Sequence, residues 1–258
     1  MGRQKKLYES HNYLNKNISS LKLPIKEYDM KEAGFSLIKE FDLLPSNQII
    51  QLSQYTKQIR TIEIGKLIEN DSKLGRNLME CFIKARKKFF ENNNLNDIDI
   101  LSIKKDAIFV IKKTCHNLKF GDNIEFVMKN RYTSYYYFNK CEFYYSSINK
   151  KLDIKGVSYK NHPLFEEIKN IFHCNEIIKN EDIVYKKLQL FRNNYLNYKL
   201  PLECYRLLSP NNNYRFKTKK GMKFFDINVD DIEEDKKEEL DISYNYLHFI
   251  QPLIEIII

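Results

Sequence analysis

The sequence predicts an α+β fold in which helices flank an antiparallel sheet and a mainly helical C-terminal region follows. Residues 99–111 and 132–145 are typical of hairpins, because short β-branched or aromatic runs flank a polar break. Residues 74–90 give the clearest amphipathic helix. Its apolar stripe consists of Leu78, Phe82, Ala85 and Phe89.

The hairpin at 99–111 carries a carboxylate at its turn. Its polar break is Lys104-Lys105-Asp106, and it lacks the glycine that two-residue hairpin turns usually contain. We therefore expect Asp106 to lie at the turn between two buried strands. An ordinary hairpin with a solvated tip explains the same pattern and remains an alternative.

A second carboxylate ends a strand earlier in the chain. Residues 23–28 form a strand candidate that stops at Asp29, and the spacing predicts a helix over 31–41. If both strands belong to one sheet, Asp29 and Asp106 come together. Two carboxylates at strand ends can hold two hard divalent cations, so we expect a metal site at this position.

Helices are predicted between these two acids. Ser46 is a suitable N-cap for a helix over 47–58, and residues 57–70 are largely helical in period. The helix at 74–90 also has a basic stripe, which is typical of a solvated face and also suits a nucleic-acid backbone. That stripe consists of Lys84, Lys87 and Lys88.

Charge favours a polyanionic partner. The 258 residues carry a formal net charge of +9, which makes nucleic acid the first expectation and leaves a merely lysine-rich surface as the alternative. No apolar run long enough to cross a membrane is present, and no signal peptide follows Met1, so no membrane partner is expected.

The five cysteines do not form a disulfide framework. Their number is odd and their spacing wide, which predicts the cytoplasm or another reducing intracellular compartment, including that of a virus-infected cell. Cys115-His116 and His173-Cys174 are adjacent pairs, but neighbours on a strand point to opposite faces and the usual zinc spacings are missing. A structural zinc site is therefore not expected.

The order of these pieces resembles the palm domain of right-handed template-directed polymerases, and the B-family DNA polymerases in particular. The matching residues are Glu27-Tyr28-Asp29-Met30, Ser102 to Val110 around Asp106, Lys129-Asn-Arg-Tyr132, and Asp153-Ile-Lys155-Gly156. The turn departs from the B-family Asp-Thr-Asp pattern, because it has one acid. Position 34, where a bulky residue usually screens against ribose, is glycine.

The resemblance implies three regions and a set of site residues. Residues 1–22 would be an N-terminal arm, 23–157 a palm-like domain with a finger-like insertion at about 46–92, and 158–258 a thumb-like region. The implied catalytic and Mg²⁺-binding residues are Asp29 and Asp106. The implied contacts to the incoming triphosphate are Arg60 and Lys66, and those to the primer strand are Lys129, Tyr132 and Lys155.

Three functional hypotheses follow. The first is a minimal or split nucleotidyltransferase of viral or plasmid type, which makes DNA or RNA with two metal ions, alone or with a further subunit. The second is a non-catalytic nucleic-acid-binding or assembly protein on a degenerate palm scaffold, because Lys104 and Lys105 can neutralise Asp106 in place of a metal. The third is a structural protein with a lysine-rich surface.

Overall fold

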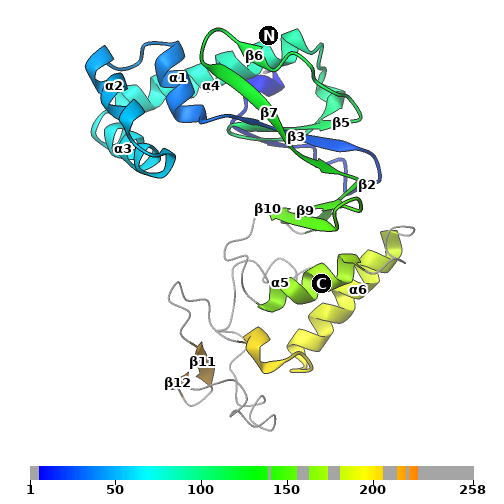
Figure 1. Ribbon diagram of the computed structural model, residues 1–258. Coiled ribbons are helices and arrows are strands. Elements are labelled where there is room, and N and C mark those ends of the chain that lie inside the picture. The colour runs from blue at the N-terminus through cyan, green and yellow to red at the C-terminus, as the bar shows by residue number, and fades with distance from the viewer. Residues whose placement is uncertain are drawn as a thin grey trace, which may run out of the picture. The chain divides into compact units, whose positions relative to one another are not determined.

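The computed structural model describes residues 6–138, 141–155, 163–173, 181–205, 214–218 and 221–225. These fall into two compact units, which are described separately (Figure 1). The first unit comprises the described residues of Met1–Ile18 and Leu23–Tyr132. The second comprises those of Ser19–Lys22 and Thr133–Ile258.

An antiparallel sheet of six strands forms the first unit, in the order β1-β4-β5-β3-β7-β6. The three central strands are buried on both faces along most of their length, as their β-branched and aromatic sequences predict. The strands are β1 (Asn12–Leu14), β3 (Ile25–Met30), β4 (Ile100–Lys104), β5 (Ala107–Ile111), β6 (Lys119–Phe120) and β7 (Ile124–Tyr132).

Four helices accompany this sheet, and Figure 1 shows α1, α2 and α3 gathered at one end of it. They are α1 (Ala33–Glu40), α2 (Ser46–Gln54), α3 (Lys57–Asn70) and α4 (Ser72–Asn92), with short 3₁₀ turns at Leu7–Glu9 and Asp97–Asp99. The predicted apolar stripe of α4 is buried in the core of this unit, where Phe89 contacts Tyr28 of β3 and Phe126 of β7. This stripe is confirmed.

The second unit contains a four-stranded antiparallel sheet in the order β10-β9-β8-β2. Its core joins the sheet to two helices, and Phe172 of α5 packs on Tyr136 and Phe143. The elements are β2 (Ser20–Leu21), β8 (Ser134–Phe138), β9 (Cys141–Ser146), β10 (Lys151–Lys155), α5 (Pro163–His173), α6 (Glu181–Leu196), a 3₁₀ turn at Leu202–Tyr205, and the hairpin of β11 (Tyr214–Thr218) and β12 (Gly221–Phe225).

The predicted α+β class is confirmed, with both hairpins in place and the helices α5 and α6 in the C-terminal part. Two local predictions were wrong. Ser46 is the first residue of α2 and does not cap it, because the cap position falls on Pro45. Asp29 lies within β3, whose last residue is Met30.

The N-terminal stretch and the unit boundary also differ from expectation. Part of the predicted arm is strand, since β1 pairs with β4 and β2 pairs with β8. The units divide after Tyr132, inside the region assigned to one palm-like domain. The division into arm, palm-like and thumb-like regions stays a prediction. The hairpin turn at residues 139–140 and Gly156 lie outside the described residues.

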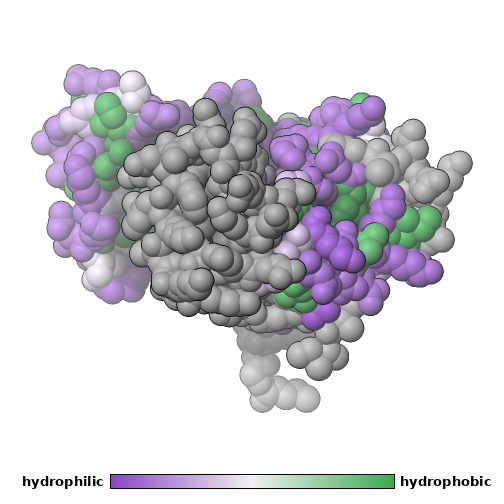
Figure 2. Space-filling model, turned by 90° about the horizontal axis from the view of Figure 1, so that it is seen from below, coloured by the Kyte–Doolittle hydropathy of each residue, from purple (hydrophilic) through white to green (hydrophobic). Residues whose placement is uncertain are grey.

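The described surface over α2 and α3 is mainly hydrophilic, with a few hydrophobic residues among the polar ones at the left of Figure 2. The exposed hydrophobic side chains of these two helices are Ile50, Ile59 and Ile62. Within the part of the chain that the structure describes, no helix combines the length and apolarity that crossing a bilayer requires.

Candidate functional site

The structure brings Asp29 and Asp106 together at one end of the central strands. Asp29 pairs in register with Ala107, the first residue of β5, and the backbone N–H of Met30 donates to the carbonyl of Asp106 at 3.1 Å. Both aspartates line one cavity of about 400 Å³, which we call the carboxylate pocket. The predicted meeting of two strand-end acids is therefore observed in the first unit.

Arg86 of α4 holds the turn that carries Asp106. Its guanidinium is completely buried and donates to the carbonyls of Tyr8 (2.9 Å) and Lys105 (2.6 Å). A third contact joins Arg86 Nη2 to His11 Nδ1 at 3.3 Å, and the histidine must accept because arginine only donates. Burial lowers the pKa of Arg86 to about 10, against an opposing effect of Asp106. Arg86 thus fixes the backbone of the turn to α4.

A lysine occupies the position of this turn where glycine is usual. Lys105 has a φ of +53°, in the left-handed region that favours glycine, whereas Asp106 is not among the residues of positive φ. Lys105 and Asp106 form the turn together, so the expected position of the acid at the turn is confirmed, and the residue of positive φ is Lys105. Arg86 stabilises this conformation through its bond to the Lys105 carbonyl.

Asp106 lies in an environment that disfavours its charge. Burial raises the pKa of Asp106, the neighbouring Asp29 raises it further, and Lys105 and Lys129 lower it. A carboxyl crowded by a second carboxylate gains most from an added cation. Asp29 and Asp106 are therefore suited to binding a cation, and the ammonium group of Lys129 already supplies part of that positive charge.

Lys129 of β7 is the counterion of Asp29. Its Nζ lies 2.9 Å from Asp29 Oδ2, with the lysine side chain 54% exposed and the aspartate 23% exposed. The bond to Asp29 raises the pKa of Lys129, with smaller contributions from Glu27 and Asp106. The resemblance assigned Lys129 to a primer strand, whereas its observed contact is with the first aspartate.

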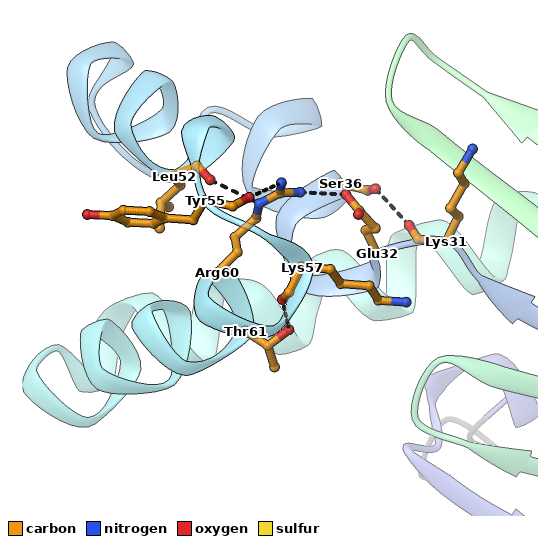
Figure 3. A network of polar contacts seen from close by, with 8 residues as sticks. All are labelled: Lys31, Glu32, Ser36, Leu52, Tyr55, Lys57, Arg60 and Thr61. Atoms are coloured by element: carbon orange, nitrogen blue, oxygen red, sulfur yellow. Dashed lines mark hydrogen bonds and ion pairs between the residues drawn. The ribbon is translucent and has the colours of Figure 1, made fainter.

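Arg60 of α3 lines the carboxylate pocket, and three of its N–H donors bond to other residues of the first unit (Figure 3). It donates to the carbonyls of Leu52 (2.9 Å) and Tyr55 (2.7 Å) and to the Glu32 carboxylate (2.6 Å), and it stacks on the ring of Phe35. Arg60 therefore joins α1, α2 and α3 at the pocket wall, and its assignment to the incoming triphosphate stays a prediction.

The helix α3 offers a different cation to the pocket. Lys57, Thr61, Ile64, Gly65 and Ile68 line it at helical spacing, while Lys66 lies off this face and pairs with Glu63 at 2.7 Å. Sequence reasoning chose Lys66 and missed Lys57. Figure 3 shows the Lys57 side chain extending from the start of α3 toward Glu32.

Tyr132 is part of the interior. It is 0% exposed, its hydroxyl donates to Glu27 at 2.8 Å, and its ring stacks on Phe109. The assignment of Tyr132 to a primer contact is therefore corrected, because no face of this side chain is accessible. Lys155 lies at the end of β10 in the second unit, whose placement relative to the carboxylate pocket is not described.

The three predicted basic residues of α4 line a second cavity in the first unit, of about 610 Å³. We call it the lysine cavity. Its cations are Lys84, Lys87, Lys88 and Lys119. It shares no lining residue with the carboxylate pocket.

The donor set of the carboxylate pocket limits the metals it can hold. Among the described residues, no group of three or more histidines, cysteines, aspartates and glutamates is placed to bind a metal. Two carboxylates fit Mg²⁺, which proteins often bind through one or two carboxylates together with substrate phosphates and water. Of the two Cys-His pairs, Cys115-His116 belongs to no group of three or more potential ligands among the described residues, and Cys174 lies outside them.

Comparison with known proteins identifies one family. A search of curated proteins finds no match. The family model described as Bacteriophage PBS1 gene 130 protein matches residues 1–258, which is the whole sequence. The chain therefore belongs to the Bacteriophage PBS1 gene 130 protein family.

Proposed function

We propose that this phage-family protein acts on nucleic acid and that its carboxylate pocket binds a divalent cation together with nucleotide phosphates. The observation that carries the proposal is the adjacency of Asp29 and Asp106 on a pocket that Lys57 also lines. The reaction class that fits best is nucleotidyl transfer on a palm-like core, by this chain alone or with another subunit.

Each residue of the pocket has a separate task in this proposal. Asp29 and Asp106 would hold Mg²⁺, which when bound activates a hydroxyl and stabilises charge on phosphate. Lys57, from the opposite wall, supplies positive charge for a polyphosphate. Arg60 and Arg86 position the walls through their bonds to carbonyls and to Glu32. Lys129, which contacts Asp29 Oδ2, would compete with a cation for this carboxylate.

A metal titration with matched variants tests this proposal. Mn²⁺ binding, followed by the loss of the free-ion EPR signal, is measured for the wild type, Asp29→Asn and Asp106→Asn, with and without nucleoside triphosphates. We expect at least tenfold weaker binding in both variants and no primer extension, while the exposed Asp97→Asn control keeps both. Unchanged Mn²⁺ affinity in both pocket variants contradicts the proposal.

A second candidate is a non-catalytic nucleic-acid-binding protein. The ion pair between Lys129 and Asp29 favours it, because a lysine ammonium already neutralises the acid that would bind metal. This candidate predicts nucleic-acid binding that weakens with salt and does not change with Mg²⁺. Removing the competing charge separates the two candidates. Lys129→Met should tighten Mn²⁺ binding severalfold if the pocket is a metal site and leave it undetectable otherwise.

A further inference from the structure

The lysine cavity gathers cations from two parts of the first unit. Lys84, Lys87 and Lys88 come from the C-terminal half of α4, and Lys119 comes from β6. The remaining wall includes the rings of Phe41 and Phe120. The cavity thus combines positive charge with aromatic surface.

Its two carboxylates neutralise little of this positive charge. Glu40 accepts hydrogen bonds from the backbone N–H groups of Asp122 (3.1 Å) and Asn123 (2.8 Å), so that it anchors the loop after β6. Glu91 lies 3.7 Å from Lys87, and both are about half exposed, which makes the pair weak. Neither acid neutralises the whole group of lysines.

Gly121 builds the wall that Glu40 anchors. It has a φ of +59°, and a Cβ added there would lie 1.7 Å from Glu40 Oε1. Only glycine allows the loop to pass this close to the carboxylate. The cavity is therefore shaped by specific residues and is more than a row of surface lysines.

Lys84 and Lys88 lie one helical turn apart and repel each other, which costs stability in an isolated helix. Lys84 Nζ lies over the ring of Phe41, 5.4 Å from its centroid. Among the described residues, no carboxylate forms an ion pair with Lys84 or Lys88, while Lys119 has one weak pair with Glu125 at 3.9 Å. An anionic ligand relieves the repulsion.

We propose that the lysine cavity binds the phosphate backbone of a nucleic-acid single strand. Lysines at one-turn spacing can contact successive phosphates, and the partly exposed ring of Phe41 offers an apolar contact to a base that a bare inorganic anion lacks. A flexible strand can enter a concave site, whereas duplex phosphates lie on a rigid convex surface. The inference rests on the proposed nucleic-acid partner but not on metal chemistry, since none of these residues lines the carboxylate pocket.

Fluorescence anisotropy with a labelled oligothymidine tests the proposal. Lys84→Ala/Lys88→Ala should weaken binding about tenfold or more and reduce the salt slope by roughly 0.7 per lysine, or about 1.4 in total. The control Lys66→Ala/Lys73→Ala removes the same charge from exposed sites outside the cavity and should change affinity less than twofold. Lys84→Ala/Lys88→Ala should bind Mn²⁺ as the wild type does, which separates this test from that of the metal site.

Lysine acetylation of the wild type provides a measurement that does not depend on variants. Bound oligothymidine should protect Lys84 and Lys88 from an N-hydroxysuccinimide ester and leave Lys73 unprotected, as read by mass spectrometry. Equal protection of all three, or equal affinity of the two double variants, overturns the proposal. Duplex DNA binding as tightly as the single strand, or tripolyphosphate competing equally per phosphate, overturns the assignment of a single strand.

Discussion

The carboxylate pocket and the lysine cavity, both in the first unit, gather side chains of opposite charge. In the pocket, two like-charged acids are adjacent, and three of the described cations near them are held by partners: Lys129 by Asp29, Arg60 by Glu32, and Arg86 by two carbonyls. Lys57 and Lys105 also line the pocket. In the lysine cavity, Glu40 is held by backbone N–H groups and Glu91 forms a weak pair with Lys87, while Lys84 and Lys88 have no ion pair among the described residues.

This difference indicates how each site gains from a ligand. A cation entering the pocket competes with Lys129 for Asp29, so the existing ion pair lowers its affinity. A phosphate entering the lysine cavity displaces only water and counterions, so its affinity should depend steeply on salt. We therefore expect weak, selective binding in the pocket and stronger, less selective binding in the cavity.

The largest expected loss of stability comes from removing Arg86, which fixes the turn at the carboxylate pocket. Arg86→Met leaves the carbonyls of Tyr8 and Lys105 without their donor, and each buried group that loses a partner costs roughly 1–3 kcal/mol. We expect the free energy of unfolding to fall by about 3 kcal/mol in urea titrations. The control Arg76→Met, on an exposed part of the same helix, should change it by less than about 0.5 kcal/mol. Similar losses in both variants contradict a specific role for Arg86.

A smaller loss of stability is expected from a substitution at Gly121, in the wall of the lysine cavity. Gly121→Ala forces Glu40 away from the loop amides and places alanine in the left-handed region, at an expected cost of about 2 kcal/mol. Oligothymidine binding should weaken while Mn²⁺ binding stays unchanged. Gly65→Ala is the matched control, because it lies inside α3 with no atom within 4 Å of an added Cβ and should be neutral or stabilising. Equal destabilisation by both substitutions contradicts the inferred close approach.

The smallest expected effect is a gain of stability, and it comes from removing the charge of Asp106 in the carboxylate pocket. Asp106→Asn removes a charge that burial and Asp29 disfavour, so thermal unfolding at pH 7 should show a gain of roughly 0.5–2 kcal/mol. Because the folded pKa of Asp106 lies above its ordinary value of 3.8, the native state favours the protonated acid. The wild type therefore loses stability as pH rises through that folded pKa, and the gain should vanish below about pH 4. A loss of stability at pH 7 contradicts this electrostatic description.

Local sequence patterns predicted the large elements because those elements have clear periods. The α4 stripe marks one buried face, and the continuous apolar runs of β4 and β5 are typical of strands buried on both faces. The strands β1, β2 and β6 have only two or three residues, too few to show an alternation. Their pairing depends on distant partners such as β4 and β8, which a local pattern does not contain.

The two aspartates of the site could be predicted because each lies in or next to a strand with a recognisable sequence pattern. Asp29 and Asp106 follow strand-like runs, and antiparallel pairing of β3 and β5 makes them neighbours. On α3, isoleucines occur around the helix, with Ile59 47% and Ile62 58% exposed but Ile64 only 7% exposed. The apolar pattern therefore did not identify the inward face, and Lys66 was chosen where Lys57 lines the pocket.

The close approach of Gly121 to Glu40 has a consequence for the evolution of the family. These positions lie 81 residues apart, yet the space at one depends on the length of the side chain at the other. We expect correlated substitution in related phage sequences: a residue larger than glycine at position 121 should occur only with a side chain shorter than glutamate at position 40. Lysines at positions 84 and 88 should be retained where the pair Gly121 and Glu40 is retained, as one inherited unit.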